Sequence, residues 1–233
     1  AEDPATPDGA TPRGVAAQQG HAAVVRFLVT EGNAAVDQAT SDGATPLYLA
    51  AQQDHAAVVR FLVTECKAAV DQANEDGDTP LCFAALQGYE AVVRFLVTEG
   101  YAAVDQATNS GDTPLCIAAY QGHAVAATLL AVFGADLAGQ VQGLTAEARA
   151  RGRGHPGLAA FLGAVAGWPG VKIAVACRLA DAARSGLRHG RLDPAGSGTP
   201  TELAAVAGSP AGALWPGSPA ACEATAALAK AAM

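Results

Sequence analysis

The chain has 233 residues, of which 51% are hydrophobic and only 5% aromatic, and its formal net charge is −8. The charge is uneven, since residues 1–167 contain 8 Lys/Arg and 18 Asp/Glu, whereas residues 168–233 contain 6 and 4. Nucleic-acid binding rests on Lys and Arg contacts to phosphates, so this composition argues against a nucleic-acid partner. A basic protein partner fits the charge better.

Threonines recur at a fixed step of 34 residues, at Thr11, Thr45, Thr79 and Thr113. Each is followed by a proline, and the first three stand two residues after an Asp-Gly pair. A fixed period in this range predicts a solenoid, because each repeat must stack on its neighbours to bury its apolar face. Stacked repeats form extended concave surfaces, so the period also favours a protein-binding function.

The second repeat shows the elements that we expect in each unit. Thr45 can cap a helix that has Pro46 at its first position and ends at Asp54. A second helix is expected from His55, and its spacing predicts a buried face made of Val58, Val59, Leu62 and Val63.

This order of motifs resembles the ankyrin repeat. The residues that carry the resemblance are Thr45, Pro46, Leu47, Ala50, Ala51 and His55, with the Val-Val-x-x-Leu helix after them. The resemblance implies an all-α ankyrin-repeat solenoid, in which helix–turn–helix repeats are joined by β-turn or hairpin loops. An irregular, partly helical tail would follow the repeats.

The departures from the family pattern predict local differences. The step is 34 residues rather than the family's usual 33, and Tyr48, Cys82 and Cys116 stand where the family has a histidine. Loss of that histidine is expected to loosen each repeat slightly. Asp54 replaces a left-handed glycine, and Asp tolerates that conformation better than most residues.

The first and last units are degenerate. Arg13 and Gly14 replace Leu47 and Tyr48 of the second repeat, so the first helix loses a core contact and is either a frayed edge or a polar cap. We expect an N-terminal edge (1–7), a degenerate repeat 1 (8–41), repeats 2 to 4 (42–75, 76–109, 110–141), a degenerate, arginine-bearing capping repeat (142–167) and an Ala/Gly/Pro-rich tail (168–233).

The tail carries weaker signals. We expect helices at 171–188 and 220–233. The run 158–177 has one charge and is near the length that spans a bilayer, but Pro169 and several glycines argue against a span. A membrane-tethered protein stays an open alternative. The chain begins without Met, and we expect an incomplete N-terminus with further repeats upstream.

The five cysteines form no C-x-x-C pair, which argues against a zinc site. Cys82 and Cys116 occupy the same place in successive repeats, too far apart for a disulfide. We therefore expect free thiols and an intracellular protein, cytoplasmic or nuclear.

Two other columns of residues recur by repeat. The histidines at 21, 55, 123 and 155 would be spread along a solenoid, so we expect a structural role rather than a metal site. Arg26, Arg60 and Arg94 are expected on a solvated outer face rather than in an anion site. No phosphate-binding loop and no G-x-S-x-G nucleophile turn is present, so we expect a non-enzymatic module without a cofactor.

Repeats 2 and 3 differ at 11 of 34 positions, mainly at the loop tips and on the first helix. The resemblance implies that these positions line the concave groove, although drift at unconstrained positions would give the same pattern. We expect a monomer that binds a basic protein segment with an apolar anchor, Leu86 and Tyr120 being its apolar contacts. The alternative is the targeting part of a larger ligase or kinase. The candidate contact residues are Asp42, Ala44, Gln52, Gln53, Glu75, Asp76, Asp78, Leu86, Gln87, Asn109, Ser110, Asp112, Tyr120 and Gln121.

Overall fold

The structure is a computed structural model that describes residue 6, residues 9–32 and residues 35–166. The chain forms two compact units, residues 1–117 and residues 118–233. The predicted tail helices at 171–188 and 220–233 lie outside the described residues, as does most of the apolar run 158–177. Among the described residues, no helix is both long and apolar enough to cross a bilayer.

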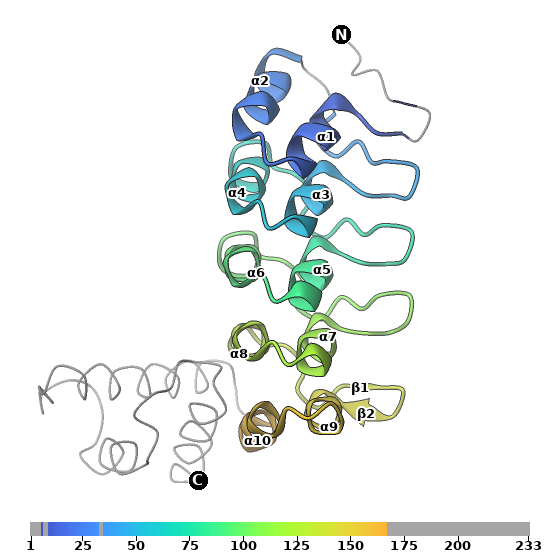
Figure 1. Ribbon diagram of the computed structural model, residues 1–233, viewed down its shortest axis with the longest axis vertical. Coiled ribbons are helices and arrows are strands. Elements are labelled where there is room, and N and C mark those ends of the chain that lie inside the picture. Colours follow the sequence, from blue (N-terminus) through green and yellow to red (C-terminus); the bar gives the residue numbers. More distant parts are fainter. Residues whose placement is uncertain (1–5, 7–8, 33–34, 167–233) are drawn as a thin grey trace, which may run out of the picture. The chain divides into compact units, whose positions relative to one another are not determined.

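The first unit consists of helix pairs that stack on one another. Helices α1, α3 and α5 form one column, and α2, α4 and α6 form a second (Figure 1). The loops between the pairs project from the first column, away from the second (Figure 1). The bounds are α1 Pro12–Gln18, α2 Ala22–Gly32, α3 Pro46–Gln52, α4 Ala56–Thr64, α5 Pro80–Gln87 and α6 Glu90–Thr98, and α7 (Pro114–Gln121) crosses the boundary between the units.

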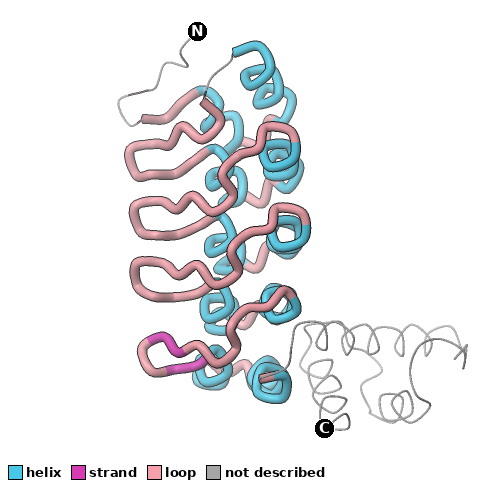
Figure 2. Tube along the Cα trace, turned by 180° about the vertical axis from the view of Figure 1, so that it is seen from behind, coloured by secondary structure: helices cyan, strands magenta, loops and turns pink. Residues whose placement is uncertain are grey.

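The second unit contains α8 (Ala124–Val132), a two-stranded hairpin, α9 (Ala146–Gly152) and α10 (Pro156–Val165). Strand β1 (Gln140–Val141) pairs antiparallel with β2 (Leu144–Thr145), which is the hairpin that Figure 2 draws in magenta. The described part of the chain is therefore helical apart from this hairpin, which confirms the predicted all-α repeat solenoid.

Each first helix begins as the Thr-Pro pair predicts. The Oγ1 atom of Thr45 accepts a hydrogen bond from the Tyr48 N–H at 3.1 Å, and Pro46 occupies the first helical position. Thr79 caps α5 in the same way, with the Cys82 N–H as donor at 3.1 Å. The side-chain oxygen satisfies an N–H that has no partner within the helix, which fixes where each helix begins.

Left-handed residues end both helices of a repeat. Gly88 ends α5 with φ +71°, and Asp54 takes the same place after α3 with φ +57°, which confirms the prediction for Asp54. Lys67 and Tyr101, after α4 and α6, have φ values of +57° and +53°. The Ala68 N–H then reaches back to the Leu62 carbonyl at 3.0 Å, which closes the helix end.

The core of the first unit lies between the two columns. The predicted face of α4 (Val58, Val59, Leu62, Val63) is buried, as are its equivalents in α6. Phe61 and Phe95 are buried as well, although the sequence pattern did not mark them as core residues.

Arg13 corrects the expectation of a lost core contact in α1. Its side chain is buried, and its guanidinium donates to the Ala35 carbonyl. Repeat 1 therefore fills the position of a core leucine with an arginine that reaches a backbone acceptor. A buried charge needs such a partner, because burial without one is costly.

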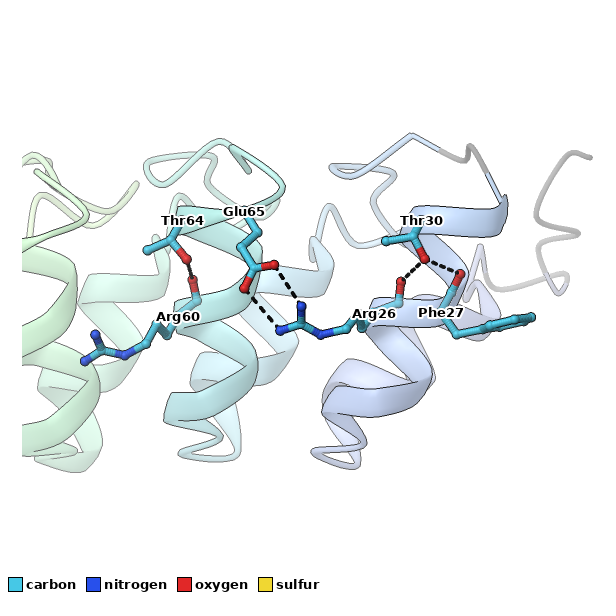
Figure 3. A network of polar contacts seen from close by, with 6 residues as sticks. All are labelled: Arg26, Phe27, Thr30, Arg60, Thr64 and Glu65. Atoms are coloured by element: carbon cyan, nitrogen blue, oxygen red, sulfur yellow. Dashed lines mark hydrogen bonds and ion pairs between the residues drawn. The ribbon is translucent and has the colours of Figure 1, made fainter.

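The arginine column is exposed, as expected for a solvated outer face, and Arg26 and Arg60 also contact the next repeat. Arg26 Nη1 lies 2.9 Å from Glu65 Oε2, and its guanidinium carbon lies 4.5 Å from the centre of the Phe61 ring (Figure 3). Arg60 makes the same two contacts in the next repeat. Its Nη1 lies 3.1 Å from Glu99 Oε2, and its guanidinium carbon lies 4.8 Å from the centre of the Phe95 ring. Each arginine thus joins its repeat to the next.

The histidines join neighbouring repeats too. His55 Nε2 lies 3.0 Å from the Gln18 carbonyl of the preceding repeat. A Cβ at Gly20 would lie 2.7 Å from the same ring, so the histidine packs where glycine leaves room. In the second unit, His155 stands against Gly122 in the same way. The described residues contain no cluster of three or more metal-ligating side chains, and the structural role predicted for these histidines agrees with their contacts.

Candidate protein-binding surface

Each loop of the first unit is closed by one side chain. In the loop that leads into the third repeat, Asn74 Oδ1 accepts hydrogen bonds from the Asp76 N–H at 3.1 Å and from the Asp78 N–H at 2.8 Å. Thr40 has this role one repeat earlier, since its Oγ1 accepts from the Ala44 N–H at 3.1 Å. A short polar side chain that binds its own loop backbone is typical of tight turns.

Successive loops are also bonded to each other. The Glu75 N–H donates to the Asp42 carbonyl at 2.9 Å, and the Asn109 N–H donates to the Asp76 carbonyl at 3.0 Å. Gly77 has φ +79°, and a Cβ there would lie 2.6 Å from the Asn109 nitrogen, so this close approach requires glycine. Figure 2 shows the loops one above another from behind. The backbone therefore sets the spacing of the side chains at the tips.

The tips carry a group of carboxylates that we name the acidic loop face. Its members are Asp42, Glu75, Asp76, Asp78 and Asp112. The first three are exposed, and the last two are half-buried. Burial raises the pKa of Asp78, and the negative charges of Asp76 and Asp112 raise it further. The carboxylates are thus close enough to oppose one another's ionisation.

Tyr48 lies beneath this face and was not among the predicted contact residues. Its ring packs edge-on against Phe83 with centroids 5.7 Å apart, and its hydroxyl accepts a hydrogen bond from Asn74 Nδ2 at 3.4 Å. Burial, followed by the charges of Asp78, Asp76 and Asp42, raises the pKa of Tyr48 to about 12. The sequence signals for its place were that it occupies a variable first-helix position and stands where the family has a histidine.

The predicted contact residues of the first unit differ in how far their side chains are exposed to a partner. Ala44 is 2% exposed, which corrects its assignment, because a buried side chain cannot contact a partner at the surface. Gln52 and Leu86 are half-buried. The exposed ones outside the acidic loop face are Gln53, Gln87, Asn109 and Ser110. The side chain of Asn109 already makes one hydrogen bond within the chain, because its Nδ2 donates to the Glu75 carbonyl at 2.7 Å.

Tyr120 and Gln121 belong to the second unit. Both are exposed, but the Arg153 guanidinium carbon lies 4.0 Å from the centre of the Tyr120 ring. One face of this ring therefore lies against a cation from the capping repeat, and its role as an apolar contact stays a prediction. The contact joins α7 to the end of α9, about 33 residues further along the chain.

The described cysteines (Cys66, Cys82 and Cys116) are free, as predicted. Burial raises the pKa of the Cys82 thiol. The thiol donates a hydrogen bond to the Gln106 carbonyl oxygen, with the sulfur 3.6 Å from that oxygen. Burial and the nearby Glu65 raise the pKa of Cys66. The raised pKa values favour the protonated thiol in Cys66 and Cys82, which argues against a nucleophilic role for these two residues.

The family comparison agrees with this geometry. The family model for ankyrin repeats (3 copies) matches residues 1–74 and 65–140, which is more than half of the chain. The comparison with curated proteins finds none that matches.

Proposed function

Because this chain belongs to the ankyrin repeat family, whose repeats are generally protein-interaction modules, we propose that its acidic loop face binds a segment of another protein. Ankyrin repeat domains are typically non-catalytic, and the module would act through binding alone. The observation that supports this surface is that backbone hydrogen bonds between successive loops hold its carboxylates at fixed spacing. Burial raises the pKa of Asp78, and the charges of Asp76 and Asp112 raise it further, which agrees with this crowding.

The preferred ligand is a segment with Lys or Arg beside an apolar residue. A cation placed among Asp76, Asp78 and Asp112 would relieve their mutual repulsion, which gives binding a favourable electrostatic contribution. The half-buried Leu86 on α5 would contact the apolar residue. Complementary charge of this kind mainly speeds association, so the association rate should fall as salt rises.

The test compares two charge reversals in the full chain. Asp76→Lys changes an exposed carboxylate of the acidic loop face, while Glu90→Lys makes the same charge change at an exposed position that begins α6. Binding is measured by fluorescence anisotropy against a panel of peptides that combine two or three Lys/Arg with one aromatic or aliphatic residue.

We expect Asp76→Lys to weaken the best peptide about tenfold and to reduce the salt dependence of its association rate. Glu90→Lys should change affinity less than about twofold. Equal losses in both variants would assign the effect to net charge. Binding that is unaffected by either variant would place the contact surface elsewhere.

A further inference from the structure

Three arginines on α9 and at its C-terminal end make different contacts within the second unit. Arg149 Nη2 donates to a backbone carbonyl of β1 at 3.2 Å, and Arg151 Nη2 lies 2.5 Å from Glu147 Oε1. The Arg153 side chain has neither an ion pair nor a hydrogen bond with the described residues, and its guanidinium carbon lies 4.0 Å from the centre of the Tyr120 ring. Arg153 is therefore held by the flat face of its guanidinium, and its N–H groups remain available to a ligand.

The surroundings of Arg153 are open. Arg153 and Tyr120 are both exposed, and so is Gln121 beside the tyrosine. A Cβ at Gly152 or at Gly154 would meet no atom of the described residues within 4 Å. A ligand can therefore approach the edge of the guanidinium from solvent.

A guanidinium that is fixed in this way is suited to binding a carboxylate. Its planar fork matches the two oxygens of a carboxylate with two parallel N–H···O hydrogen bonds. Stacking on Tyr120 orients the fork before a ligand arrives, which lowers the entropy lost on binding. The exposed part of the tyrosine ring offers apolar area beside the fork, and Tyr and Arg are enriched among the residues that dominate binding at protein interfaces.

The charge of the second unit favours a carboxylate over a polyanion. Its described residues contain 3 Arg, 1 Asp and 1 Glu, and no Lys. Arg149 and Arg151 already contact acceptors within the chain. Nucleic-acid binding needs several Lys or Arg contacts to phosphates, which a single available guanidinium does not supply. The chemistry instead matches a protein segment with an Asp or Glu beside an apolar residue.

We propose that Arg153, stacked on Tyr120, binds an Asp or Glu carboxylate of another protein. The N–H groups of Arg153 donate to the carboxylate, while Tyr120 positions the guanidinium and contacts the neighbouring apolar side chain. This surface has the opposite charge to the acidic loop face and belongs to the other unit. It does not depend on the function proposed for the acidic loop face.

The test uses the full chain and two short peptides. One peptide has two glutamates beside one leucine, and its twin has glutamines in place of the glutamates. Binding is followed in ¹H–¹⁵N spectra, in which the side-chain Nε–Hε signal of Arg153 is identified by its loss in Arg153→Gln. Backbone amide signals give the Kd in every variant. Lys67→Gln is the matched control, because it removes one positive charge at an exposed position of the first unit.

We expect the glutamate peptide to shift the Arg153 Nε–Hε signal of the unsubstituted chain, with a Kd of about 0.1–1 mM, and the glutamine peptide to bind at least about fivefold more weakly. Arg153→Gln should weaken binding of the glutamate peptide about tenfold. Arg153→Lys should weaken it about fivefold, because an ammonium keeps the charge but lacks the fork. Lys67→Gln should change affinity less than about twofold.

Two further variants test the positioning role of Tyr120. Tyr120→Leu leaves the arginine in place but removes the ring that orients it, and it should weaken the glutamate peptide about threefold. Tyr120→Phe keeps the ring and should change affinity less than about twofold. Equal effects of the two variants would overturn the part assigned to the ring.

Several results would overturn the proposal. An Arg153 signal that does not move at peptide concentrations up to about 10 mM would do so in the unsubstituted chain, without any variant. Equal binding of the two peptides would mean that the carboxylate is not the group recognised. Equal losses in Arg153→Gln and Lys67→Gln would assign the effect to net charge.

Two results would assign the arginine to a different ligand. Tighter binding of a single-stranded oligonucleotide than of the glutamate peptide, lost in Arg153→Gln, would assign it to nucleic acid. Dimerisation of the chain alone in sedimentation, lost in Arg153→Gln, would assign it to a carboxylate of a second copy.

Discussion

The acidic loop face and the second-helix column of the first unit are built by the same 34-residue step, with opposite electrostatic results. In the loops, the step places like charges above one another, as with Asp42 and Asp76 or Asp78 and Asp112. In the helix column, Arg26 meets Glu65 and Phe61 of the next repeat. The helix side therefore uses its charges to join repeats, and the loop side gathers like charges. We take the first as the stabilising side and the second as the binding side.

The largest expected effect tests whether the helix side carries the stability. Phe61→Ala removes a buried ring and should cost about 3–5 kcal/mol in the free energy of unfolding. Phe27→Ala removes the equivalent, mostly exposed ring and should cost less than about 1 kcal/mol. Urea unfolding of both variants measures the difference. Similar costs would mean that the packing beneath Arg26 adds no stability.

The second prediction concerns the loop side, where backbone contact sets the spacing. Gly77→Ala must place a Cβ 2.6 Å from the Asn109 nitrogen at φ +79°, and we expect a loss of about 2 kcal/mol. Gly154→Ala, in the second unit, has φ +84° but no atom within 4 Å, so it should cost about 1 kcal/mol. Thermal unfolding of the two variants gives both losses. The loss in Gly154→Ala measures backbone strain alone, and the extra loss in Gly77→Ala measures the crowding against Asn109. Equal losses would show that the neighbouring loop moves aside freely.

Local patterns predicted most of the fold because each depends on few neighbouring residues. The capping by Thr45, the buried face that includes Val59 and the left-handed Asp54 all follow from spacing within one repeat. The contacts between repeats did not follow in this way. The pairing of Arg26 with Glu65 requires the three-dimensional stacking of two helices, although Arg and Glu do recur five residues apart in each of the first three repeats.

The candidate site was harder to predict than the fold. Of the carboxylates that the turn-tip sequence indicated, Asp42, Glu75 and Asp76 are exposed, but the sequence could not tell the buried Ala44 from an exposed residue. The cover that Arg153 provides over Tyr120 depends on how two helices pack within the second unit. Tyr48 was missed because its importance comes from its carboxylate neighbours and not from its own position in the repeat.

The third prediction measures the helix-side pairing itself. Arg60→Ala and Glu99→Ala, made singly and together, form a double-mutant cycle. We expect a coupling energy of about 0.5–1 kcal/mol, since the pair is exposed. The coupling should decline at 1 M NaCl, because salt screens exposed charges. Arg60→Lys keeps the charge but loses the planar guanidinium over Phe95, and it should recover only part of the stability. A coupling energy near zero would mean that the Arg60–Glu99 ion pair adds no stability and that Arg60 contributes only through its packing on Phe95.

The smallest expected effect bears most directly on function. Because the folded-state pKa of Asp78 is raised, its ionisation opposes folding at any pH above that pKa. Asp78→Asn should therefore stabilise the chain at pH 7, by about 0.5 kcal/mol or less after solvent screening. The gain should vanish below the unfolded-state pKa, where Asp78 is protonated in both states, and it should shrink at high salt. The same substitution should weaken binding of a basic peptide.

Opposite changes in stability and binding distinguish a binding surface from sequence drift. A carboxylate that merely drifted would, on removal, stabilise the chain without any loss of affinity, whereas a retained binding group costs stability in the free state and returns it when a cation binds. The measurements are urea unfolding at pH 7 and pH 3 beside peptide anisotropy at pH 7, with Glu90→Gln as the control. If Asp78→Asn destabilises the chain equally at both pH values, its carboxylate is a structural hydrogen-bonding group, and the binding side must be sought on other residues.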